Sequence, residues 1–354
     1  MQATATTPTL APFANCPALD GCHCITASLA KIFHHAGHPV SEDMLLGLGA
    51  GMGFIYWQMK LAGETMIFVG GRGNLKGFYQ DLARRTGVHI AEKTTSSAKK
   101  AEEALLRSLA AQRPVFLGAD MGLLPWFDLP AGYHFGGHAF VACGYDGHQT
   151  ILGADVEQKA AGIKKGFYAP ITLDQLRKAR NSPFKPFPPQ NLWLEFDFSG
   201  FHAPGRKEIA ESIAQAVDAH LNPPIKNFGV SGMRHTASQL LKWPSLFNDN
   251  ELRMNLFNLY IFIEIGGTGG GCFRSMYARF LDESSRTARM PALAQAAESF
   301  RESARRFTSI AMLFEHAATA ADLRPRIQTA AETFRQIAEL EEQAWRLLQK
   351  STWP

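Results

Sequence analysis

The sequence lacks long hydrophobic runs and a strong excess of charge of one sign. None of its apolar stretches approaches the roughly 20 residues that a membrane-spanning helix needs, so no membrane association is expected. Charged residues make up 19% of the 354 residues and the formal net charge is only +4, which argues against a disordered chain and against nucleic acid as a partner. Hydrophobic residues make up 46%, as is typical of a globular protein with ordinary cores.

The sequence also shows no pattern of a disulfide framework, and we do not expect its first residues to form a signal peptide. Its five cysteines are an odd number, and Cys22 and Cys24 stand too close together for a relaxed mutual disulfide. These features favour a reducing, cytoplasmic location. Residues 1–17 have no basic segment followed by a continuous apolar core, so they are expected to form a loose tail.

Two segments of different pattern follow this tail. Residues 18–203 mix amphipathic helical patterns with short apolar runs such as 65–71 and 113–120, which are typical of buried strands. Residues 204–354 show only amphipathic helical patterns. We therefore expect an α+β domain at 18–203 and a mainly helical domain at 204–354, each large enough for its own core.

The stretch "ALDGCHCITASLAKIFHHAG" at residues 18–37 places two cysteines at the start of a predicted helix. Cys24 opens the helix, where the dipole stabilises a thiolate and unpaired backbone amides can receive an oxyanion. Cys22 lies two residues further out in the loop, where the dipole is weaker. Since the thiolate is the nucleophilic form, we expect Cys24 to be a nucleophile, with Cys22 or a merely buried thiol as the alternatives.

A cysteine enzyme needs a base, and His138 in "GGHAFVACGYDG" stands at the start of a predicted strand. Asp146-Gly147 is typical of a two-residue hairpin turn, and Asp155 ends the returning strand. This register places Asp155 opposite His138, where a carboxylate orients an imidazole. His134, in the preceding loop, is the alternative base. These residues and the cysteine thus predict a catalytic triad.

A metal site at Cys22-His23-Cys24 is not expected. Zinc sites favour cysteines separated by two to four residues together with a second distant pair, and the sequence shows no such pair. The histidines at the end of the same predicted helix, His34, His35 and His38, are typical of solvated partners of the helix dipole. We expect neither a metal nor another cofactor.

Taken together, the motifs resemble the butirosin biosynthesis protein H family. The similar stretches are "HCITASLAKIFHHAG", "SEDMLLGLGAGMGFIYW", "MIFVGGRG", "VFLGADMGLLPW", "FGGHAFVACGYDG", "LGADVEQ" and, in the second domain, "FIEIGGTGGGCFRSMYARFLDES". They cover nearly the whole chain. The resemblance implies a papain-like N-terminal domain followed by a helical domain, with Cys24, His138 and Asp155 as the catalytic residues.

The resemblance also implies acyl transfer in secondary metabolism. In the namesake, an acyl group carried as a thioester on an acyl carrier protein passes through the enzyme's cysteine to an amine of an aminoglycoside. Here Cys24 would attack the thioester, His138 would move the proton, and a small-molecule amine would take the acyl group. The alternatives are hydrolysis by the same triad, as a thioesterase, amidase or peptidase, and a non-catalytic binding protein on this fold.

One departure from papain-like proteases concerns the oxyanion. Those enzymes place a glutamine donor a few residues before the cysteine, whereas this chain has Ala18, Leu19 and Asp20 there. Backbone amides near the cysteine would then supply the donors, with Tyr56 as a further candidate. Tyr56, Trp57 and Trp126 are also candidates for the wall of an acyl pocket, with core packing as the alternative.

Two glycine-rich segments are candidates for binding an anion such as a phosphopantetheine phosphate. They contribute Arg72 in "VGGRGN", and Gly269, Gly270 and Arg274 in "GGTGGGCFR". Both can equally be structural, and the second lacks the Lys-Ser/Thr of a P-loop. Scattered basic residues of the second domain are either solvated helix faces or a surface that docks an acidic carrier protein. Its apolar helices are compatible with a homo-oligomer.

Overall fold

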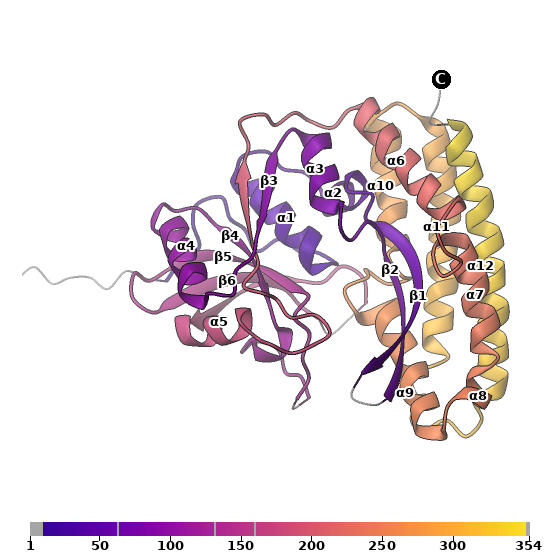
Figure 1. Ribbon diagram of the computed structural model, residues 1–354. Helices are drawn as coiled ribbons and strands as arrows, with labels where there is room; N and C mark the ends of the chain where they lie inside the picture. Colours follow the sequence, from indigo (N-terminus) through magenta and orange to yellow (C-terminus); the bar gives the residue numbers. More distant parts are fainter. Residues whose placement is uncertain (1–9, 62–63, 131, 159–160, 352–354) are drawn as a thin grey trace, which may run out of the picture. The chain divides into compact units, whose positions relative to one another are not determined.

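The computed structural model describes residues 10–61, 64–130, 132–158 and 161–351. It is 49% helix and 17% strand, which confirms the mixed α+β class (Figure 1). The chain divides into two compact units. Unit 1 is made of Met1–Glu42, Gly87–Gln158 and Lys164–Phe201, and unit 2 of Asp43–Thr86, Lys159–Ile163 and His202–Pro354.

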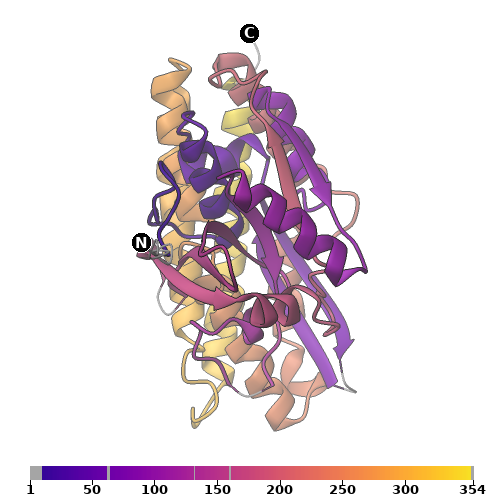
Figure 2. The same cartoon turned by 90° about the vertical axis from the view of Figure 1, so that its left-hand side faces the viewer.

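Unit 1 is built on a six-stranded antiparallel sheet in the order β3–β8–β4–β5–β6–β7, with α1 packed on its central strands (Figure 1 and Figure 2). Strands β4 and β5 are almost wholly buried, as expected of uninterrupted apolar runs. Its elements are α1 (Cys24–His35), β3 (His89–Lys93), α4 (Ala98–Ala110), β4 (Val115–Ala119), η1 (Met121–Leu123), β5 (His138–Tyr145), β6 (Thr150–Val156), β7 (Gly166–Thr172), α5 (Leu173–Arg180) and β8 (Trp193–Asp197).

The β5–β6 hairpin is present as predicted, but its turn is longer than two residues. The Asp146 carboxylate accepts hydrogen bonds from the amides of His148, Gln149 and Thr150, at 2.8, 2.9 and 3.0 Å. These bonds, the one from Thr150 most strongly, lower the pKa of Asp146 to about 2. The turn therefore closes at Thr150, and the register of the two strands differs from the predicted one.

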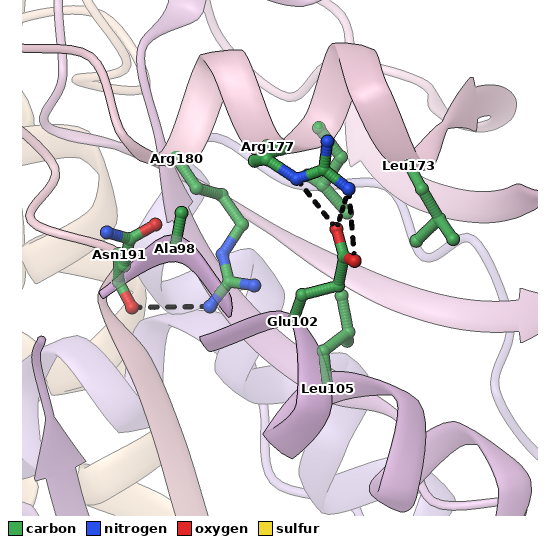
Figure 3. Close-up of a pocket in the computed structure, with 8 residues that line it drawn as sticks. Ala98, Glu102, Leu105, Leu173, Arg177, Arg180 and Asn191 are labelled. Atoms are coloured by element: carbon green, nitrogen blue, oxygen red, sulfur yellow. Dashed lines mark hydrogen bonds and ion pairs between the residues drawn. The ribbon is translucent and has the colours of Figure 1, made fainter. Parts of the chain in front are cut away.

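Helices α4 and α5 are joined by an ion pair in which Arg177 grips both oxygens of Glu102 (Figure 3). Arg180 beside it is buried and donates to the carbonyls of Ala101 and Asn191, at 3.3 and 3.2 Å. Burial lowers the pKa of Arg180 to about 10, against the opposing charge of Glu102. The small pocket in Figure 3 lies between these side chains.

Residues 10–17 are attached to unit 1, contrary to the expectation of a loose tail. The amide of Phe13 donates to the carbonyl of Cys143 at 2.7 Å, and the hydroxyl of Tyr168 donates to the carbonyl of Cys16 at 2.8 Å. Phe13 and Cys16 are both buried, so apolar burial and hydrogen bonding hold this segment. Residues 1–9 of the expected tail lie outside the described residues.

Unit 2 combines a two-stranded antiparallel ribbon with long helices that pack side by side, α10 on α11, α11 on α12, and α12 on α7 (Figure 1). From His202 onward the described residues contain helices and no strand, as predicted. Its elements are α2 (Glu42–Leu48, whose first residue ends a segment of unit 1), β1 (Met52–Leu61), β2 (Glu64–Arg72), α3 (Phe78–Thr86), α6 (Arg206–Leu221), α7 (Gly229–Leu240), α8 (Trp243–Leu246), α9 (Asp249–Tyr260), η2 (Ile261–Ile265), α10 (Arg274–Thr287), α11 (Pro291–Met312) and α12 (Arg324–Ser351).

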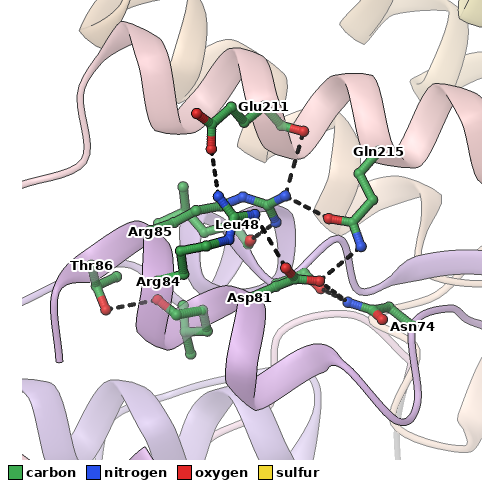
Figure 4. A network of polar contacts seen from close by, with 10 residues as sticks. Leu48, Asn74, Asp81, Arg84, Arg85, Thr86, Glu211 and Gln215 are labelled. Atoms are coloured by element: carbon green, nitrogen blue, oxygen red, sulfur yellow. Dashed lines mark hydrogen bonds and ion pairs between the residues drawn. The ribbon is translucent and has the colours of Figure 1, made fainter. Parts of the chain in front are cut away.

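The compact units do not follow chain order alone. Residues 43–86 belong to unit 2, because β1 packs on α7 and β2 packs on α9. A polar network further ties α3 to α6 (Figure 4). In it Arg84 binds Glu211 at 2.6 Å, and Gln215 donates to Asp81 at 2.8 Å. The boundary at 203–204 marks the change of pattern along the sequence and stays a prediction.

Within the ranges that the structure describes, no helix combines the length and the apolar character that crossing a bilayer requires.

Candidate active site

Helix α1 begins at Cys24, with His23 as its N-cap, as the sequence pattern predicts. Cys22 is fully buried, whereas Cys24 is partly exposed. The first amides of a helix have no intrahelical acceptor and carry the positive end of its dipole, so the sulfur of Cys24 lies in a favourable field for negative charge. Of these two cysteines, Cys24 is thus the one that solvent and a substrate can reach.

The carboxylate of Glu42 fixes the turn that leads into Cys24. It accepts hydrogen bonds from the amides of Cys22 and His23 and from the hydroxyl of Thr26, each at 2.8 Å. Gly21 completes the turn because a Cβ there would lie 2.7 Å from Cβ of Ala27 and 3.1 Å from Glu42 Oε2. Nothing in the sequence around Glu42 indicates this role, because its partners lie 16 to 20 residues earlier in the chain.

His138 and Asp155 form a buried pair, with Nε2 of His138 2.8 Å from Oδ2 of Asp155. Burial acts to lower the pKa of His138, but the charge and the hydrogen bond of Asp155 outweigh it. With a further contribution from the hydrogen bond to Cys24, they raise this pKa to about 10. Because Asp155 occupies Nε2, Nδ1 is the nitrogen left for the thiol. His138 is therefore an imidazolium at neutral pH, held between a carboxylate and a sulfur.

The register that brings the two side chains together differs from the predicted one. Val141 pairs with Ala154, and continuing this register by one residue places Asp155 opposite Phe140 instead of His138. The shift amounts to two residues, so the side chain of Asp155 keeps its face of the sheet and reaches His138 diagonally. The prediction of direct opposition was wrong, whereas the predicted proximity is present.

The loop after η1 covers this pair with two aromatic residues. Nε1 of Trp126 donates to Oδ2 of Asp155 at 3.0 Å. The ring of Phe127 packs edge-on against the imidazole of His138, with 5.2 Å between the ring centroids. The other carboxylate oxygen of Asp155 accepts from the amide of Val156 at 2.8 Å. Trp126, expected in a pocket wall, thus orients the carboxylate. Phe127 follows Trp126 directly and ends the aromatic stretch 121–127.

His134, the alternative base, belongs to a separate cluster. Its Nδ1 lies 2.9 Å from the buried carboxylate of Asp120, which also accepts from the hydroxyl of Ser182 at 2.5 Å. Burial acts to raise the pKa of Asp120, but these bonds and those from backbone amides hold it below its usual value. The imidazole of His134 stacks on Phe184 at 3.4 Å. The hydrogen bond to Cys24 is made by His138.

The remaining residues proposed for substrate binding lie in unit 2. The hydroxyl of Tyr56 accepts from Nε1 of Trp243 at 3.3 Å, and its side chain is buried. Burial raises the pKa of this hydroxyl, against the effect of the Trp243 bond. These contacts are those of a core residue. Trp57, the next residue of β1, is 43% exposed.

The two arginines in glycine-rich segments are engaged within unit 2. Arg72 donates to the carbonyl of Gly51 at 3.0 Å and lies over the ring of Phe78 at 4.5 Å. Arg274 is fully buried and pairs with Glu341 through Nε–Oε1 at 2.8 Å and Nη2–Oε2 at 3.1 Å. A guanidinium whose charge is already neutralised in this way is not available to a phosphate.

The glycine loop before Arg274 surrounds a carboxylate of its own. The amide of Gly271 donates to Oε2 of Glu264 at 3.0 Å, and a Cβ at Gly270 would lie 3.1 Å from Oε1 of Glu264. An anion bound by Gly269 and Gly270 would meet this negative charge. Of the two interpretations of this loop, these contacts support the close-packed junction rather than the phosphate site.

Comparisons with known families match the chain in two parts. Residues 23–155 match the family described as Butirosin biosynthesis protein H, N-terminal, and residues 174–348 match a Domain of unknown function (DUF4872). The first match contains Cys24, His138 and Asp155. No curated protein matches the chain. Where the structure describes side chains, no group of three or more His, Cys, Asp or Glu residues is placed to hold a metal ion.

Proposed function

Residues 23–155 belong to the family described as Butirosin biosynthesis protein H, N-terminal, and from this premise we propose that the chain is a cysteine-dependent acyltransferase of secondary metabolism. The observation that carries the proposal is the position of His138, between the carboxylate of Asp155 and the partly exposed thiol of Cys24. A papain-like fold for unit 1 is part of the same proposal.

In the first step the Cys24 thiolate attacks the carbonyl carbon of an acyl thioester, on a carrier protein or another pantetheine-type donor. The resulting oxyanion is stabilised by backbone amides at the start of α1. The carbon–sulfur bond of the donor then breaks, and the His138 imidazolium gives its proton to the departing thiolate. The acyl group is now a thioester on Cys24, and His138 is neutral.

In the second step a small-molecule amine attacks the carbonyl carbon of this acyl-enzyme. Neutral His138 takes a proton from the amine nitrogen as the new amide bond forms, and Cys24 departs as a thiolate. Asp155 stabilises the imidazolium at the start and end of the cycle, and Trp126 and Val156 hold its carboxylate in place. Water in place of the amine would make the same residues a thioesterase.

The test is intact-mass spectrometry of the full chain after incubation with a panel of acyl-pantetheine and acyl-carrier-protein thioesters, with and without amines. Wild type, Cys24→Ala and the matched control Cys22→Ala are compared. We expect an acyl adduct on wild type and on Cys22→Ala but not on Cys24→Ala, released faster by an amine than by water.

Two results would overturn the proposal. An adduct that persists on Cys24→Ala would mean that another residue is the nucleophile. An adduct that water alone removes as fast as any amine would identify a hydrolase.

A further inference from the structure

Lys164 lies beside the turn that leads into Cys24. Its amide donates to the carbonyl of Gly21 at 2.8 Å and its carbonyl accepts from the amide of Gly21 at 2.9 Å, so the two residues form an antiparallel bridge. The side chain is only 3% exposed, and Nζ lies 3.5 Å from Oε1 of Gln158. Removing an ammonium group from water is costly unless negative charges lie nearby.

Four groups that can carry negative charge face Lys164, namely Cys24, Cys22, Glu42 and Asp155. Burial lowers the pKa of Lys164, and these charges act in the opposite direction, with Cys24 the strongest of them. The two carboxylates already accept several hydrogen bonds each, and Cys22 is fully buried. Cys24 is thus the partly exposed member of the set.

A second buried lysine, Lys31, does not have Cys24 among the charges that act on it. Lys31 of α1 is also inaccessible, and burial lowers its pKa. The charges that oppose this effect come from Asp155, Glu42, Cys16 and Cys143. Of the two buried lysines, Lys164 is therefore the one placed to act on the Cys24 sulfur.

We propose that Lys164 is a positioning residue whose ammonium group stabilises negative charge on the sulfur of Cys24, together with the imidazolium of His138. The inference rests on the proposed function only in taking Cys24 as the reactive thiol. It supplies a cation next to a turn that has Ala18, Leu19 and Asp20 where papain-like proteases place a glutamine.

The test compares alkylation of Cys24 by anionic iodoacetate and by neutral iodoacetamide, followed by peptide mass spectrometry. A nearby cation favours the anionic reagent, so the ratio of the two rate constants reports charge at the sulfur rather than general integrity of the fold. Lys164→Met is compared with Lys165→Met, which removes the same charge from the exposed neighbouring residue.

We expect the iodoacetate-to-iodoacetamide ratio to fall about 3- to 10-fold in Lys164→Met and to stay near the wild-type value in Lys165→Met. Lys164→Arg, which keeps the charge, should restore the ratio. Lys164→Gln serves as a second neutral variant, and circular dichroism checks that each variant is folded.

An unchanged iodoacetate-to-iodoacetamide ratio in folded Lys164→Met or Lys164→Gln would overturn the inference. Alkylation needs no acyl substrate, so the two proposals fail separately. If no thioester acylates Cys24, the acyltransferase is refuted while the alkylation ratio still tests Lys164.

Discussion

Two buried histidines, one in each unit, have pKa values shifted in opposite directions. His138 in unit 1 is 2% exposed and His220 in unit 2 is 1% exposed, so burial alone would lower the pKa of both. Beside Asp155, the pKa of His138 is instead raised to about 10. Burial together with the charge of Arg274 lowers the pKa of His220 to about 4.

The hydrogen bonds of the two rings agree with these states. Nδ1 of His220 lies 2.7 Å from the carbonyl of Ala216 and donates to it, as suits a neutral ring stacked on Trp345. Both nitrogens of His138 have partners, a carboxylate and a thiol. A buried histidine is thus charged beside a carboxylate such as Asp155, and neutral where a cation such as Arg274 adds to the effect of burial.

The largest expected effect comes from removing the charged ring of unit 1. His138→Ala should reduce the rate of Cys24 acylation by about 10²- to 10⁴-fold, because it removes the proton donor and the partner of the thiolate. The rate is measured by intact mass after rapid mixing with a thioester. His134→Ala is the matched control and should change the rate by less than about 10-fold. Equal losses in both variants would mean that the wrong histidine has been assigned.

Breaking the ion pair next to His220 should affect stability more than chemistry. Arg274→Met leaves the carboxylate of Glu341 buried without its main partner, which costs about 3–5 kcal/mol in the free energy of unfolding. The control, Arg234→Met, breaks the exposed pair with Glu342 and should cost less than about 1 kcal/mol. Urea unfolding followed by circular dichroism measures both, and similar losses would contradict the structural role of Arg274.

A smaller effect is expected from Trp126→Phe, which keeps an aromatic ring against Phe140 but removes the hydrogen bond to Asp155. The loss of a bond to a charged carboxylate, about 1.5–3 kcal/mol, corresponds to a rate reduction of about 10- to 100-fold. Trp193→Phe removes a similar bond to the exposed Glu195 and should leave the acylation rate unchanged. A rate for Trp126→Phe equal to that of this control would remove Trp126 from the site.

The smallest effect should come from His220→Phe, because the new ring can keep the stacking on Trp345. At neutral pH we expect a change below about 1.5 kcal/mol in the free energy of unfolding. The folded-state pKa of His220 lies below its ordinary value, so the unfolded chain binds a proton more readily between about pH 6.5 and pH 4. As the pH falls from about 6.5 to about 4, the free energy of unfolding of the wild type should therefore decrease relative to that of the variant. If the difference in the free energy of unfolding between the two proteins does not change with pH, the conclusion that His220 is a neutral buried ring would be contradicted.

Local patterns predicted the elements that carry the site. The N-terminus of α1 at Cys24, the β5–β6 hairpin and the helical character after His202 all follow from periodicity and turn residues along a short stretch. The register at His138 could not be derived, because it depends on how Asp146 binds three amides and lengthens the turn. His138 and Asp155 still meet because a register error of two residues leaves each side chain on the same face of the sheet.

What the sequence could not predict depends on residues that meet only in the folded chain. Glu42 binds the amides of the turn that leads into α1, and Lys164 pairs with Gly21 of the same turn through a backbone bridge. Arg274 is neutralised by Glu341, on a different helix. The sequence analysis did not predict strands β1, β3 and β7. β3 is short and polar, and β7 contains Pro170, which is unfavourable in a central strand.

The central claim is that Asp155 and Cys24 together hold His138 as an imidazolium. The most direct test is an NMR pH titration of the histidine side chains in the full-length protein, with His138→Ala and His220→Phe used to assign the two resonances. The account predicts that His138 stays protonated through neutral pH with a pKa of about 10, while His220 titrates at about 4. A pKa for His138 near the 6.5 of an unperturbed histidine would contradict it.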